Sequence, residues 1–138
     1  MKKSLALVLI LTLVCAFALV GCAKKTPVAL QEKVDAFLET AAIMEDNFRG
    51  ELKISAEARD ARKLVFIYTF TTQLEDTGEL AAQLAASVRL QGELHEATIA
   101  ELRENGVKNP AVVIEYRNAD DSVLCTVEFP QKSTMKCG

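Results

Sequence analysis

The 138-residue chain has no tryptophan and a single histidine, His95. A catalytic triad needs a histidine that is oriented by a third group and lies beside a nucleophile, and a zinc centre needs three or four ligands. His95 has no such partners at a suitable spacing, and no glycine-rich phosphate loop is present. The sequence therefore argues against an enzyme and gives no indication of a metal or another cofactor. We expect His95 to be a partly exposed residue that packs on a helix.

An excess of basic charge is also missing, because 16 Lys and Arg residues stand against 19 Asp and Glu residues. The net charge of −3 argues against a nucleic-acid partner, which would require a basic surface. Asp120 and Asp121 form an adjacent acidic pair. Adjacent side chains point apart and one loop offers too few oxygens for calcium, so we interpret the pair as part of a turn.

One long apolar run, from Leu5 to Val20, follows Lys2 and Lys3. The run has about 16 residues, whereas a helix that spans a bilayer needs about 20. A basic start followed by a short apolar run and a small residue is the layout of a cleaved secretory signal peptide. We therefore expect the rest of the chain to be exported.

The run ends in Leu19-Val20-Gly21-Cys22, which resembles the lipobox of bacterial lipoproteins. The resemblance implies that the thiol of Cys22 carries a diacylglyceryl group and that the chain is cut between Gly21 and Cys22. Two acyl chains supply the stable anchoring that one chain cannot. We therefore expect the mature chain on the extracytoplasmic face of the cell membrane, with the membrane itself as a partner. The alternative is an ordinary signal peptide with a chance cysteine.

This interpretation divides the chain into a signal peptide (1–21), a lipidated tether (22–27), one α+β domain (28–130) and a C-terminal tail (131–138). Removal of the first 21 residues leaves 117, which is enough for a single core. Lys2 and Lys3 leave with the signal, so the mature chain has 14 basic and 19 acidic residues and a net charge of −5.

Apolar residues at every third or fourth position indicate two helices. The first runs from Val28 to Phe48, and the second runs from a Thr77 cap to Glu104 with a bend at Gln91-Gly92. Alternating apolar and polar residues indicate strands between and after these helices. The strands form two hairpins, one from residues 52–57 and 64–71 and the other from residues 112–116 and 123–129.

The two halves of the domain repeat the same order, so we interpret them as a duplicated helix-hairpin unit, αββαββ. Two such units bury their apolar faces most simply as a four-stranded antiparallel sheet with both helices on one face. The sequence therefore predicts an α+β two-layer sandwich, and it leaves the order of the strands open.

Four apolar residues alternate onto the sheet face opposite the expected helices: Val65, Ile67, Val113 and Leu124. A solvated face should be polar at these positions. One interpretation is scattered apolar exposure of the ordinary kind. The other is a contiguous interaction face for a protein partner or for self-association with a second copy of the chain.

Cys125 and Cys137 are the thiols that remain besides Cys22 in the mature chain. Outside the cell they can form a disulfide that closes a loop of about 13 residues and contributes roughly 3 kcal/mol in the chain-entropy model. The bridge requires the tail to turn back along the last strand. The alternative, which we favour because Cys125 faces inward, is an inert buried thiol and a free tail cysteine.

In the second half, Val107-Lys108-Asn109-Pro110 leads into Val112 to Tyr116 and then into Asn118-Ala119-Asp120. This layout resembles the DUF4854 family of small lipoproteins from Firmicutes, over about residues 30–130. Relatives often have Asp-Gly in the turn where this chain has Asp121, which must take any left-handed conformation at some cost. An aromatic residue is also common at the position of Cys125. The resemblance implies a fold and a location, and it transfers no functional residues.

These features together predict a membrane-anchored extracytoplasmic lipoprotein that serves as a small interaction or binding module for an unknown ligand. The alternative is a structural envelope-associated lipoprotein with no small-molecule ligand. A pocket ringed by polar groups between the helices and the sheet would favour the first interpretation.

Metabolic labelling with an alkyne-bearing fatty acid in a bacterial host tests the anchor. We expect the wild-type chain to incorporate the label and the Cys22→Ala variant to lose it, because the acylated thiol is gone. The Cys15→Ala variant is the matched control and should be labelled normally, since Cys15 leaves with the signal peptide. Labelling that survives Cys22→Ala would contradict the prediction.

Overall fold

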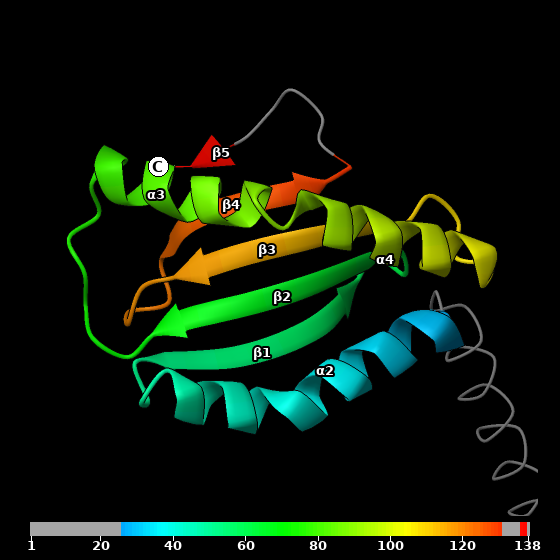
Figure 1. Cartoon of the computed structure of the whole chain (residues 1–138), viewed down its shortest axis with the longest axis horizontal. Helices are drawn as coiled ribbons and strands as arrows, with labels where there is room; N and C mark the ends of the chain where they lie inside the picture. Colours follow the sequence, from blue (N-terminus) through cyan, green and yellow to red (C-terminus); the bar gives the residue numbers. More distant parts are fainter. Residues whose placement is uncertain (1–25, 131–135, 138) are drawn as a thin grey trace, which may run out of the picture.

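The computed structural model describes residues 26–130 and 136–137. The predicted signal peptide and lipobox, including Gly21 and Cys22, lie outside the described residues. Figure 1 shows the fold. The elements in chain order are α2 (Val28–Asn47), β1 (Leu52–Arg59), β2 (Lys63–Phe70), α3 (Gly78–Arg89), α4 (Gly92–Glu104), β3 (Ala111–Arg117), β4 (Val123–Phe129) and β5 (Lys136–Cys137).

Both predicted helical segments form, and the second is broken where a bend was predicted. The Thr77 hydroxyl caps α3 by accepting a hydrogen bond from the Leu80 N–H at 3.1 Å. α3 ends at Arg89 and α4 begins at Gly92, where glycine lowers the helix propensity. The described part of the chain therefore has three helices where the periodicity predicted two.

Both predicted hairpins are present. In the first, Ile54 on β1 lies opposite Tyr68 on β2, and in the second, Ile114 on β3 lies opposite Val127 on β4. The outer edge of β1 is covered by α2. There, Glu45 Oε1 accepts a hydrogen bond of 2.7 Å from the backbone N–H of Ile54.

The sheet has the order β1-β2-β3-β4-β5, and its central pair, β2 and β3, is parallel. The predicted purely antiparallel sheet is therefore wrong. The reason is the length of the connection between β2 and β3: α3 and α4 have 12 and 13 residues and extend about 37 Å, whereas strands of seven or eight residues extend about 25 Å. In Figure 1 the two helices run the length of the strands from one end of the sheet to the other. They return the chain to the end where β2 began, and Lys63 lies opposite Ala111.

The parallel pairing of β2 with β3 also shows that the predicted duplication is incomplete. Because β2 and β3 run in the same direction, the two hairpins turn in opposite senses when they are viewed from the helices. No rotation superimposes the two units while their helices stay on the same face of the sheet. The repeat is therefore one of element order and does not extend to three-dimensional structure.

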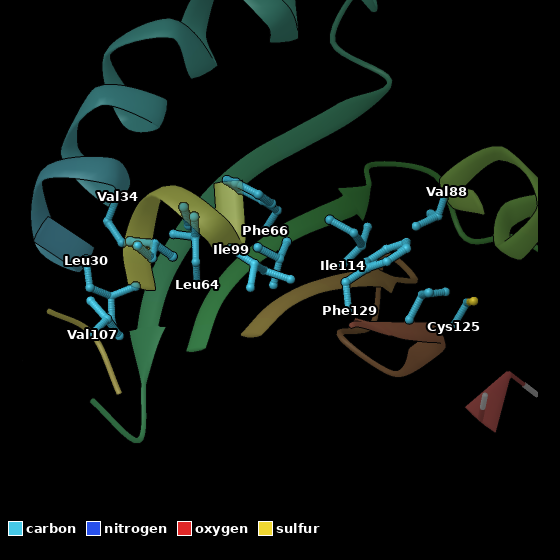
Figure 2. Close-up of a cluster of buried hydrophobic side chains, with 14 of the residues drawn as sticks. Leu30, Val34, Leu64, Phe66, Val88, Ile99, Val107, Ile114, Cys125 and Phe129 are labelled. Carbon is cyan, nitrogen blue, oxygen red and sulfur yellow. The ribbon is translucent and has the colours of Figure 1, made fainter. Parts of the chain in front are cut away.

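A single core cluster joins the three helices to one face of the sheet. Figure 2 shows Leu30 and Val34 of α2 at one end of this cluster and Val88 of α3 at the other, with Phe66 between them. The buried members are Leu30, Val34, Ala56, Leu64, Phe66, Ala85, Val88, Ile99, Leu102, Val107, Val112, Ile114, Cys125, Val127 and Phe129.

The opposite face of the sheet was predicted to expose apolar residues, and this prediction is wrong. Val65 is 0% exposed, Leu124 1%, Val113 5% and Ile67 8%. Three of them, Val65, Ile67 and Val113, form a small buried cluster that is separate from the main core. The predicted interaction face therefore has neither scattered exposure nor a contiguous apolar patch at these positions.

An ion-pair network accounts for the burial of Val65 and Ile67 on β2. Arg59 on β1 pairs with Glu115 on β3 at 3.3 Å, so the two side chains meet across the intervening strand β2. Glu115 also accepts a hydrogen bond of 2.6 Å from Arg117 Nε, and Arg59 pairs with Glu57 as well. The long arginine stems cover apolar surface while their charged ends remain paired. The ion-pair network thus lies over the outer face of β2, which carries Val65 and Ile67.

Truncation of Glu115 tests the importance of this network. The Glu115 side chain is 7% exposed, so Glu115→Ala should leave two arginines without their buried partner and lower the free energy of unfolding by about 1–3 kcal/mol. Glu57→Ala removes a half-exposed partner of the same arginine and should cost less than about 1 kcal/mol. Urea denaturation of the chain from residue 22, with Cys22→Ser, measures both. Equal losses would show that the network does not depend on Glu115.

Candidate functional site

A pocket of about 430 Å³ opens between α2, α3 and the helix-covered face of the sheet. This volume falls in the usual range for small-molecule sites. None of the described residues that line it is charged. The lining residues are Met44, Phe48, Leu52, Tyr68, Phe70, Leu84, Ser87, Val88, Gln91, Ile114 and Tyr116.

Three aromatic rings form the floor of the pocket. The parallel register places Tyr68 on β2 directly opposite Tyr116 on β3, and their ring centroids are 5.2 Å apart with planes inclined by 24°. Phe70, two residues after Tyr68 on the same face of β2, lies 6.3 Å from Tyr116 at 23°. The rings therefore stand side by side in a nearly parallel row.

The walls of the pocket come from two helices. Met44 and Phe48 lie at the C-terminal end of α2, and Phe48 is 48% exposed at the rim. α3 contributes Leu84, Ser87 and Val88, whose spacing of three and four places them on one helical face. The break between α3 and α4 adds Gln91. Interruption of the helix therefore adds a polar side chain to the lining of the pocket.

The two phenols are the principal polar groups of the floor. Burial raises the pKa of Tyr68 and of Tyr116, and the neighbouring Tyr116 adds to the increase for Tyr68. Both hydroxyls are therefore protonated at neutral pH and can donate a hydrogen bond. Neither hydroxyl has a hydrogen-bond partner among the described residues, so both are available to a ligand.

A second hollow, of about 290 Å³, lies between α2 and α4 but is less suited to a ligand. Lys33 and Glu101, which line it, form an ion pair of 2.7 Å with each other. A ligand would have to compete with this pair, whereas the phenols of the larger pocket have no hydrogen-bond partner within the described part of the chain. We therefore take the larger pocket as the candidate site.

None of the residues of the predicted interaction face lines this pocket. Val65, Ile67 and Val113 alternate with core residues and so lie on the other side of the sheet. No single sequence signal points to the pocket, because its residues come from four separate segments and belong to no motif. A correct prediction of the parallel β2–β3 pair, which places Tyr68 opposite Tyr116, would have located the pocket.

His95 is a core residue and was wrongly predicted to be partly exposed. Its ring packs against Phe129 and Phe66, with centroid distances of 5.0 and 6.3 Å. Nε2 is buried and has no hydrogen-bond partner in the described part of the chain. Burial lowers the pKa of His95, because the charged imidazolium would lose its hydration. The neutral ring therefore fills space between the helices and the sheet.

Cys125 is disulfide-bonded, so the favoured interpretation of an inert free thiol is wrong. The tail does turn back along the last strand: β5 pairs with β4, and the register places Cys137 directly opposite Cys125. Directly opposed residues of an antiparallel pair are close enough for a disulfide. Cys125 also belongs to the same core cluster as Val88, which lines the candidate pocket (Figure 2).

Asp120 and Asp121 lie in the turn between β3 and β4, as predicted. Asp120 Oδ1 accepts hydrogen bonds from the backbone and hydroxyl of Ser122, which lower the pKa of Asp120. Asp121 has φ of 66°, the left-handed conformation predicted for it. Within residues 26–130, no group of three or more His, Cys, Asp or Glu side chains is arranged to hold a metal ion.

No helix in the described ranges is both long enough and apolar enough to cross a bilayer. A family model described as a domain of unknown function, DUF4854, matches residues 29–129. This match runs from the second residue of α2 to the last residue of β4. No curated protein and no solved structure matches the chain.

The two tyrosines of the pocket are the only tyrosines in the chain, so phenolate absorbance reports on the pocket alone. We expect both to ionise above the ordinary value of about 10, because burial disfavours the phenolate. In urea both should titrate near 10. Because the folded pKa values exceed the unfolded ones, the free energy of unfolding should fall as the pH rises above about 10. A folded chain in which either tyrosine titrates at its ordinary value would contradict the burial described above.

Proposed function

The chain belongs to the DUF4854 family, and we propose that it is a membrane-anchored extracytoplasmic lipoprotein whose domain binds a small molecule. The observation that carries the binding proposal is the pocket of about 430 Å³ between the helices and the sheet. A pocket of this size, lined by aromatic and aliphatic side chains with a few polar groups, is typical of small-molecule sites.

The sequence supports the membrane anchor. The lipobox places the lipid on Cys22, and only the tether of residues 22–27 separates it from the start of α2 at Val28. Met44 and Phe48 reach the pocket 16 and 20 residues after Val28, or about 24–30 Å along the helix axis. α2 therefore leads from the tether to the pocket. In a lipid-anchored chain, the pocket lies at the end of the domain that is farther from the tether.

A fragment screen with two matched variants tests the binding function. Leu84→Trp adds a large ring inside the pocket, whereas Leu94→Trp adds the same ring on α4 at a side chain that is 65% exposed. We expect saturation-transfer NMR to detect fragments that bind the wild-type chain and the Leu94→Trp variant. Leu84→Trp should weaken their binding about tenfold or more, because the volume is filled.

The same screen distinguishes the alternative of a structural lipoprotein. Fragments that bind all three proteins equally would not be in the pocket. If no fragment responds to Leu84→Trp, the binding function is wrong, and a purely structural role at the cell envelope takes its place.

A further inference from the structure

We propose that the pocket selects uncharged ligands that contain a planar ring and a hydrogen-bond acceptor. This inference rests on the proposed binding function and specifies the chemical class of the ligand. Three observations support it. The pocket floor carries a row of aromatic rings, the described lining has no charged residue, and the hydroxyls of Tyr68 and Tyr116 have no hydrogen-bond partner among the described residues.

The row of stacked rings offers stacking and edge-to-face contacts to a planar ligand. The planes of Tyr68 and Phe70 are inclined by only 24° and 23° to that of Tyr116. Aromatic pairs in offset stacked or edge-to-face arrangements gain stabilisation beyond that from the burial of their area. A planar ligand can gain this stabilisation, and a puckered aliphatic ring of the same size cannot. A row of nearly parallel rings also differs from the surrounding cage that binds quaternary ammonium groups.

The lining disfavours an ionised ligand. Its described residues include no carboxylate, ammonium, guanidinium or imidazole group that could pair with a ligand charge. An ion that enters an apolar pocket loses hydration without compensation. An anion would in addition approach a chain whose net charge is negative.

The polar groups of the pocket favour a ligand that accepts hydrogen bonds. The phenols of Tyr68 and Tyr116 are protonated donors without a partner among the described residues. Ser87 already uses its proton in a hydrogen bond of 3.1 Å to the carbonyl of Gln83. A carbonyl or ring nitrogen on the ligand would therefore meet donors that are not otherwise engaged.

Four small probes separate these properties. Coumarin is planar and neutral and carries a carbonyl acceptor, whereas octahydrocoumarin keeps the carbonyl and loses the planar ring. Coumarin-3-carboxylate is the planar anion, and N-methylquinolinium is a planar cation. Binding is measured by saturation-transfer NMR on the full, processed chain in lipid nanodiscs, with empty nanodiscs as the blank. We expect coumarin to bind about tenfold more tightly than each of the other three.

Substitutions at the central ring link the preference to the pocket. Tyr116→Leu should reduce coumarin affinity to that of octahydrocoumarin, and Tyr116→Phe should keep most of the preference because the ring remains. Circular dichroism verifies that each variant folds. If Tyr116→Leu does not fold, Phe70→Leu at the end of the row provides the same test.

The outcomes separate this inference from the function on which it rests. Octahydrocoumarin or either ion binding as tightly as coumarin would overturn the ligand class, while the response to Leu84→Trp would still support a binding site. A preference for coumarin that survives Tyr116→Leu would also overturn it. If no probe binds and the fragment screen shows no pocket ligand, both the ligand class and the binding function fail.

Discussion

The parallel pairing of β2 with β3 is the constraint on which the rest of the structure depends. It follows from a helical connection that is longer than the strands, so that the chain must return to its starting end before β3 begins. The resulting register places Tyr68 beside Tyr116, and α3 lies across the sheet at the same end. The pocket is therefore a product of the topology, and an antiparallel pairing in this position would not bring the same rings together.

Local structure was predictable from the sequence because neighbouring residues determine it. The Thr77 cap, the break near Gly92 and the left-handed Asp121 were all expected and are all present. The order of elements in the two halves does not determine the direction of β3, whereas the length of the connection before it does. A β2-helix-β3 segment is itself the usual signal of a parallel pair, and it was available in the sequence.

The pattern of apolar alternation predicted which face each strand residue occupies, but not whether that face is exposed. Val65 and Ile67 lie on the expected side of the sheet and are nevertheless buried. Their cover comes from a pairing between Arg59 and Glu115, residues that are 56 positions apart and separated in space by a strand. The periodicity of apolar residues carries no information about contacts between residues that are far apart in the sequence. For the same reason, it does not predict that the four chain segments of the pocket meet.

The hydrogen bond between Glu45 and the backbone of Ile54 affects whether copies of the chain can pair with one another when they are crowded together. An open strand edge is a template on which another chain can add a strand, and such addition leads to aggregation. Anchoring confines molecules to a plane and keeps their neighbours close, which raises the frequency of encounters between edges. By laying α2 along β1, this fold removes that edge from the intermolecular pairing that the proposed membrane anchor would otherwise favour.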